Sequence, residues 1–287
     1  MLTIYKKDMH NYFSTFVGYL FIACVLLAGG IYCYVYNFVY AYGSFESSIN
    51  YLPFFFVLLI PVISSGIFTD EKRQKTEQLL YTLPLKSSEI VWGKYLALIT
   101  ILAIPMVILG FYPVVMSFFG EVNMLSAYSN LLAIFLLGAA LCAICMFISS
   151  LSDNIIISAI LCFAVMFLLY QMSSLSEKLQ TSAKVSYIGF IILAVFLAVF
   201  IWFMTRNIYI ALIPSFIVVI VLSILYKISM GLVAGKINTM MNGVAIFSKL
   251  NNFSSGIFDL AAVIYYLSVS GLFVLFTIFT FERKRWS

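Results

Sequence analysis

The sequence is poor in charge. Of its 287 residues only 9% are Asp, Glu, Lys or Arg, whereas 64% are hydrophobic. Soluble domains carry about a quarter charged residues, so this composition excludes a soluble globular protein and predicts an integral membrane protein. The formal net charge of +5 does not indicate a nucleic-acid partner, because the basic residues lie in loops between apolar runs, where they act as topology signals.

The residue types that carry enzyme chemistry are also scarce. Histidine occurs once, at His10, whereas intramembrane Ser/His and zinc-dependent enzymes need histidines at membrane depth. No pair of acidic residues falls inside an apolar run, and the phosphate-loop-like segment 231–237 has the wrong spacing and no Ser or Thr for magnesium. The sequence therefore predicts no enzyme, and no metal or cofactor bound by this chain.

Long apolar runs dominate the chain instead. A transmembrane helix needs about 20 apolar residues, and eight runs come close to that length. We predict an all-α polytopic membrane protein, a single transmembrane domain over 1–287 with about eight spans. Six spans is the alternative, if region 185–226 folds as a re-entrant pair. The runs cover 15–40, 51–68, 95–119, 130–151, a fifth ending near 170, 185–204, 208–226 and 257–281.

Residues 1–14 form a polar and aromatic segment ahead of the first run. Its apolar side chains recur at helical spacing, with basic and polar side chains between them. This pattern predicts an amphipathic elbow helix that lies in the membrane interface with its basic face toward anionic lipid headgroups. We expect its interfacial contacts to come from Tyr5, Lys6, Lys7, Met9, Tyr12 and Phe13.

The distribution of basic residues predicts the orientation. With eight spans and an inner N-terminus, eleven of the 16 Lys and Arg residues fall on the inner side and five on the outer side, as the positive-inside rule requires. Both termini and segment 70–94 are then cytoplasmic, and segment 227–256 lies outside.

Segment 69–95 is the only long polar stretch between apolar runs in the N-terminal half. It holds nine of the chain's 27 charged residues, which are 16 basic and 11 acidic. Residues 70–81 contain no helix breaker and continue the second span, and Ser87 is a good N-cap for a helix that starts at Ser88. We therefore predict a cytoplasmic helical hairpin over 70–94.

This hairpin also carries leucines that a solvated loop does not need. Leu79, Leu80 and Leu83 are rimmed by mixed charge, which favours a docking surface for a partner protein. An ordinary positive-inside loop without a partner is the alternative reading of the same residues.

Three stretches resemble a known family. FTDEKRQKTEQLLYTLPLKSSEIVWGKYLA resembles the segment after the second span of ABC-2 type transporter permeases, and IYKKDMHNYFSTFVGYLFI is similar to their elbow and first span. NFSSGIFDLAAVIYYLSVSGLFVLFTIFTFERKRW is similar to the end of the gliding-motility-type branch. Lys75 stands where the family usually has glycine. The loop pattern is matched by Glu71, Arg73, Thr76, Glu77, Leu79, Leu80, Thr82, Leu83, Pro84 and Lys94.

The resemblance implies the transmembrane subunit of an ABC exporter in the bacterial cytoplasmic membrane. Two separate ATP-binding subunits would carry ATP and Mg, and a second permease copy or homologue would complete the path. An accessory membrane protein with a large outer domain is often part of such systems, and 227–256 would contact it. Docking to the ATP-binding subunit would use Glu71, Arg73, Thr76, Glu77, Leu79, Leu80, Leu83 and Pro84.

Two other functions fit the same pattern. The chain would serve equally in a complex where ATP hydrolysis drives mechanical work or signalling without moving a substrate. Stimulation of the ATPase by a defined solute would distinguish an exporter from such a complex. An ATP-independent channel or scaffold predicts instead that the 70–94 loop binds no ATPase. The sequence does not identify the substrate, the direction of transport, or whether the permease is a homodimer or heterodimer.

Overall fold

The computed structural model describes residues 1–40, 44–76, 86–178 and 243–286, and within them the secondary structure is entirely helical. The chain divides into two compact units, Met1–Leu168 with Lys249–Ser287, and Leu169–Ser248. In the described part of the second unit, the rings of Tyr170 and Phe247 meet edge to face, 5.2 Å apart. The first unit holds all the features discussed below.

Six helical segments in the described ranges are long and apolar enough to cross a membrane. They confirm the all-α polytopic class. The two additional predicted spans, 185–204 and 208–226, lie outside the described residues, as does most of segment 227–256. The six segments are Phe16–Val39, Phe45–Arg73, Ser87–Met116, Met124–Leu151, Ile155–Met172 and Leu260–Arg283.

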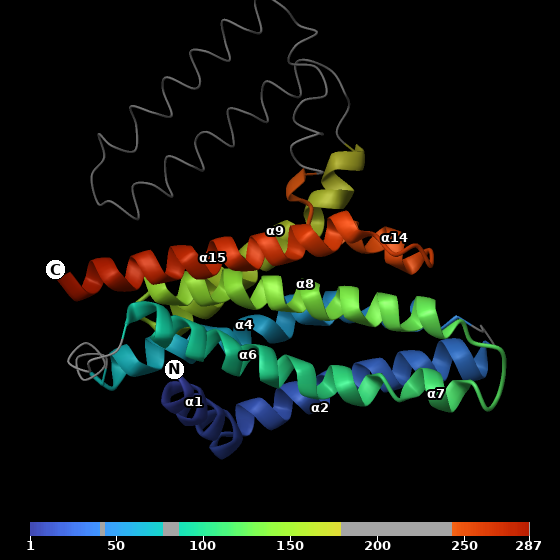
Figure 1. Cartoon of the computed structure of the whole chain (residues 1–287), viewed down its shortest axis with the longest axis horizontal. Helices are drawn as coiled ribbons and strands as arrows, with labels where there is room; N and C mark the ends of the chain where they lie inside the picture. The colour runs from blue at the N-terminus through green and yellow to red at the C-terminus, as the bar shows by residue number, and fades with distance from the viewer. Residues whose placement is uncertain (41–43, 77–85, 179–242, 287) are drawn as a thin grey trace, which may run out of the picture. The chain divides into compact units, whose positions relative to one another are not determined.

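The N-terminal helix α1 (Leu2–Ser14) is separate from the first span, as predicted. Thr15 is extended, with φ −95° and ψ 154°, and this residue turns α1 away from the common direction of the spans (Figure 1). The span itself consists of α2 (Phe16–Cys33) and a π-helical end, η1 (Tyr34–Val39).

The second span begins earlier than the sequence indicated. Residues 41–50 were expected to be a loop, but α3 (Phe45–Ile49) occupies part of this segment, and α4 (Leu52–Arg73) follows it. The reason is burial, because Phe45 and Ile49 are 0% and 1% exposed and so contribute apolar contacts that a solvated loop could not make.

The third span consists of two helices, with a turn between them and a proline in each. Helix α6 (Ser87–Leu109) contains Pro105 in its interior, and after a turn at Gly110 the short α7 (Tyr112–Met116) carries Pro113 in its first turn, where a missing N–H costs least. The candidate span that contains α6 starts at Ser87, so residues 87–94, which the predicted hairpin includes, belong to a helix long and apolar enough to cross a membrane.

Helix α8 (Met124–Leu151) is the centre of the first unit. It packs against α4, α6 and α15 (Leu260–Trp286), which lie side by side in Figure 1. Residues 152–154 connect α8 to α9 (Ile155–Lys178). The termini and the ends of α4 and α6 that flank 77–85 lie at one end of this unit (Figure 1), which we call the charged end.

Close packing around α8 depends on Gly138. A Cβ built there would lie 2.8 Å from Leu102 Cδ2 and 3.1 Å from Phe56 Cε2, so α4 and α6 both approach the helix where it has no side chain. Small residues at such crossings are what close helix contacts in membranes require.

We expect Gly138→Val to destabilise the protein by about 1–3 kcal/mol, because the added methyl groups overpack this crossing. Gly271→Val is the matched control, since a Cβ at this position in the interior of α15 meets nothing within 4 Å. Thermal unfolding in detergent measures the difference, and equal midpoints for the two variants would contradict the packing argument.

Candidate functional site

A cluster of four charged side chains joins three helices at the charged end. Lys94 of α6 lies between Glu71 of α4 and Asp8 of α1, with its Nζ 2.9 Å from Glu71 Oε2 and 3.6 Å from Asp8 Oδ2. Lys7 of α1 adds a second contact to Glu71, with Nζ 2.6 Å from Oε1. We call Lys7, Asp8, Glu71 and Lys94 the ionic cluster.

The ionic cluster is largely removed from water. Lys94 is 0% exposed, Asp8 6% and Glu71 8%. The Lys94 ammonium also donates to Ile67 O at 2.8 Å and lies 5.0 Å from the centre of the Phe68 ring. A buried charge is tolerated only when it is paired and hydrogen-bonded, and Lys94 meets both conditions.

Local sequence explains why these helices can meet. Helix α1 crosses α6 over Gly93, where a Cβ would be 3.1 Å from Met1 O and 3.3 Å from Ile4 Cβ. Ile4 and Asp8 lie one helical turn apart and form the buried face of α1. The glycine next to Lys94 therefore brings the α1 carboxylate within reach of the lysine.

The environment of Asp8 opposes its ionisation. Burial raises the pKa of the Asp8 carboxyl above its usual range, and the attraction of Lys94 only partly offsets this effect. Its Oδ2 accepts no hydrogen bond from the described residues. Asp8 is thus the least satisfied member of the ionic cluster.

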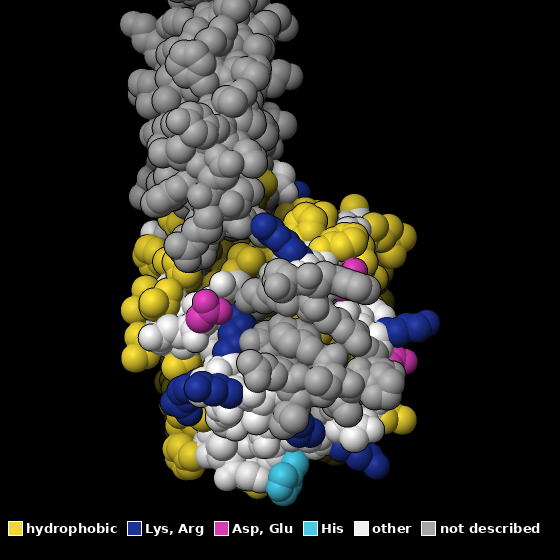
Figure 2. Space-filling view, turned by 90° about the vertical axis from the view of Figure 1, so that its left-hand side faces the viewer, with side chains coloured by type: hydrophobic (Ala, Val, Ile, Leu, Met, Phe, Trp, Pro, Cys, Tyr) yellow, Lys and Arg dark blue, Asp and Glu magenta, His cyan; other side chains and the backbone are white. Residues whose placement is uncertain are grey.

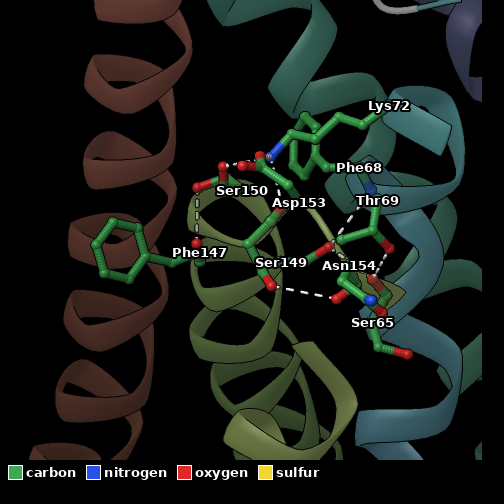
Figure 3. A network of polar contacts seen from close by, with 10 residues as sticks. Ser65, Phe68, Thr69, Lys72, Phe147, Ser149, Ser150, Asp153 and Asn154 are labelled. Atoms are coloured by element: carbon green, nitrogen blue, oxygen red, sulfur yellow. Dashed lines mark hydrogen bonds and ion pairs between the residues drawn. The ribbon is translucent and has the colours of Figure 1, made fainter. Parts of the chain in front are cut away.

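A second network fixes the end of α4 to the turn between α8 and α9 (Figure 3). Lys72 Nζ donates to Ser150 O at 3.0 Å and Ser152 O at 2.5 Å, and also contacts Asp153. These carbonyls belong to the end of α8, where a cation is favoured by the helix dipole. One turn earlier, Ser149 Oγ donates to Ser65 O at 2.8 Å.

Helix α4 ends at Arg73, so the helix expected over 70–81 is confirmed for 70–73 and wrong for 74–76, whereas 77–81 lie outside the described residues. Thr76 N donates to Glu71 O and Lys75 N to Lys72 O, at 3.0 and 3.1 Å, which is the Schellman pattern. Lys75 takes the left-handed conformation that this motif requires, with φ 56°. This is the position where the resembling family usually has glycine.

The start of α6 differs by one residue from the prediction. The helix begins at Ser87 with Lys86 as its N-cap, rather than at Ser88 with Ser87 as the cap. The Glu89 carboxylate accepts from Lys86 N at 3.4 Å. The Glu89 carboxylate therefore accepts a hydrogen bond from a backbone N–H at the helix start, and no serine hydroxyl serves as the cap.

The predicted docking residues have different surroundings. Glu71 points inward to the ionic cluster, Arg73 is exposed and 3.7 Å from Asp70, and Thr76 is half-buried in the Schellman turn. The remaining predicted docking residues, Glu77, Leu79, Leu80, Leu83 and Pro84, lie outside the described residues.

The predicted elbow residues lie on several faces of α1. The hydroxyl of Tyr5 is 3.2 Å from that of Thr100, and Tyr12 OH donates to Ile63 O at 2.7 Å. Phe13 packs edge to face on Tyr19. Met9 is half-buried, whereas Lys6 and Lys7 are exposed, and Lys7 reaches Glu71.

Three residues of the site were not singled out from the sequence in their observed roles. The sequence alone does not identify Asp8, and it places Lys72 and Lys94 in the charged segment 69–95 without indicating their buried contacts. The available signal was the spacing of Ile4 and Asp8 on one helix face, together with the Gly93-Lys94 pair inside an apolar stretch.

The surface of the charged end is basic. Figure 2 shows Lys and Arg side chains spread over it and hydrophobic side chains along its flanks. The pattern is that of a water-facing end bordered by a lipid-facing belt.

We expect Lys94→Met to lower stability by about 3–5 kcal/mol, because removal of one partner leaves buried carboxylates unpaired. Lys86→Met, at an exposed position eight residues earlier, is the control and should change stability little. Thermal unfolding of the purified chain checks both variants, and a Lys94→Met midpoint equal to that of wild type would contradict the assigned role.

The Asp8 carboxyl predicts a pH effect. A group whose pKa is raised on folding stabilises fully below its unfolded value of 3.8 and loses that contribution as pH rises through its higher folded value. Asp8→Asn should therefore become more stable relative to wild type as pH rises from below 3.8 to neutrality. Unfolding midpoints of both proteins across this pH range test the prediction. A difference between the two midpoints that does not change with pH would contradict it.

Comparison with known proteins agrees with the geometry. The sequence profile of a family described as ABC-2 family transporter protein matches residues 5–184, a stretch that includes the elbow helix, five of the six candidate spans and the whole ionic cluster. No curated protein matches the chain. On this match across more than half of its length, the chain belongs to the ABC-2 family of transporter proteins.

Proposed function

We propose that the chain is the transmembrane subunit of an ABC exporter, coupled to separate ATP-binding subunits through the hairpin at 70–94. ATP and Mg bind on those subunits, and a second permease copy or homologue completes the translocation path. The family assignment supports the permease role. The ionic cluster is the observation that supports the coupling role.

The ionic cluster joins the two arms of the hairpin at their bases. Glu71 ends the arm that leaves the second span and Lys94 lies in the arm that enters the third, and their 2.9 Å contact is buried. A force applied to residues between them reaches both spans together. A loop anchored on one side only would bend without moving the other span.

The elbow helix and α8 connect to the same bases. Lys7 and Asp8 attach α1 to the cluster, while Lys72 attaches α4 to the end of α8. A movement of the hairpin is therefore passed to four helices. This arrangement is a physical route by which closure of an ATP-binding subunit would act on the membrane-spanning helices.

The proposed orientation has both termini and the charged end in the cytoplasm of a bacterial cell. The basic surface of this end supports it. We further propose membership of the gliding-motility-type branch, on the sequence of the last span, with an accessory membrane protein that contacts segment 227–256.

The proposed function is tested by a mild-detergent pull-down of the tagged chain from its native cells, followed by mass spectrometry. We expect a soluble protein that carries a phosphate loop and an ABC signature to co-purify. The other co-purifying chains identify a homodimer, a heterodimer or an accessory subunit. Recovery without any nucleotide-binding protein would overturn the coupling proposal.

We expect the triple variant Leu79→Asp, Leu80→Asp, Leu83→Asp to insert normally but lose ATPase-subunit binding, because charged side chains cannot fill an apolar docking groove. Co-purification and ATPase activity of the reconstituted complex are the measurements. Glu282→Gln, an exposed change on α15, is the control. Unaltered binding by the triple variant would refute docking through these leucines.

A further inference from the structure

A cavity of about 170 Å³ lies beside the ionic cluster, between α1, α4 and the start of α9. Its polar wall carries three carboxylates, Asp8, Asp70 and Glu71, and no lysine or arginine belongs to its described lining. The rest of its lining includes an apolar wall with Val17, Val62 and Ile155. The cavity therefore joins an acidic pocket to a hydrophobic surface.

Two of the three carboxylates have unused acceptor capacity. Glu71 is occupied, since Oε1 contacts Lys7 and Oε2 contacts Lys94. Asp8 is 94% buried, as its 6% exposure implies, and its Oδ2 accepts no hydrogen bond within the described residues; the nearest cation, Lys94, is 3.6 Å away. Among the described residues, the one ion pair of Asp70 is a 3.7 Å contact with the exposed Arg73.

The backbone shapes this pocket around Asp70. A Cβ built on Gly66 would be 2.6 Å from Asp70 Oδ2 and 3.6 Å from Ile155 Cδ1. The Asp70 carboxylate thus folds back over the glycine, although its side chain is 45% exposed. Asp8 is buried, with an Oδ2 that accepts no hydrogen bond from the described residues, and together with the folded-back Asp70 it supplies two carboxylates to the cavity.

The chemistry of the pocket selects a small organic cation. The described residues contain no group of three His, Cys, Asp or Glu side chains that could hold a metal ion. Carboxylates repel anionic headgroups, whereas an ammonium group has three N–H donors for them. A quaternary ammonium has no N–H to donate.

We propose that this cavity binds a protonated primary amine, as found in the headgroup of an ethanolamine phospholipid. The ammonium contacts Asp8 and Asp70, and the rest of the lipid lies along the apolar wall. Val62 on that wall is 51% exposed and belongs to a membrane-spanning segment, so the cavity borders the lipid phase. The elbow helix lies at the depth where headgroups are found.

The test uses the full chain in nanodiscs of constant anionic lipid content. The zwitterionic lipid is phosphatidylethanolamine, its N,N-dimethyl form or phosphatidylcholine, with the same acyl chains. Native mass spectrometry measures retained lipid. We expect retention to fall in that order and by about tenfold or more from first to last, as loss of charge-assisted hydrogen bonds predicts.

The variants Asp70→Asn and Asp8→Asn should each remove most of this preference, and Gly66→Ala should weaken it by displacing the Asp70 carboxylate. Glu282→Gln, an exposed carboxylate of the charged end outside the cavity, should leave it unchanged. The comparison of the three lipid headgroups on the wild-type protein tests the proposal even if a variant does not fold.

A second arm separates the two sources of the amine. Free ethanolamine, titrated into the detergent-solubilised chain, should bind weakly if the lipid is the ligand and as tightly as the lipid if a soluble amine is. Both results support the site, provided that Asp70→Asn abolishes binding. Equal retention of the three lipids by wild type, or a preference that survives both Asp variants, would show a cavity that holds only water and would overturn the proposal.

Discussion

The described structure depends on one buried lysine. Lys94 lies at a site with no exposed surface, so two other helices must supply its partners: α4 provides Glu71 and the Ile67 carbonyl, and α1 provides Asp8. Each partner fixes the position of its helix. Because any helix that withdraws leaves a buried charge unpaired, the energy of this site holds α1, α4 and α6 together.

The family assignment gives this constraint a functional meaning. In the proposed function, ATP-binding subunits would act on the permease through segment 77–85, and the ends of α4 and α6 that flank this segment lie at the charged end. The surface there is basic and the interior is an ion-paired cluster. Segment 69–95 looks like a solvated loop from its composition. Two of its charged residues, Glu71 and Lys94, instead form buried contacts that connect α1, α4 and α6.

The sequence was sufficient for the class of fold, because apolar runs of span length and the separate elbow depend only on local hydrophobicity. It did not predict the site. Lys94 and Glu71 lie 23 positions apart, and their pairing depends on how α4 and α6 pack. Similarly, α3 forms because Phe45 and Ile49 find a buried surface, and α4 ends early because Lys75 adopts a conformation that helix propensity disfavours.

The composition of the ionic cluster has an electrical consequence. Its two lysines and two carboxylates carry no net formal charge, so moving the cluster as one body through the membrane field does almost no electrical work. Separating Lys94 from Glu71 along the membrane normal would do such work, at about 2.3 kcal/mol per charge across 100 mV. Helix movements that keep the pair intact are therefore insensitive to the membrane voltage, and those that break it are not.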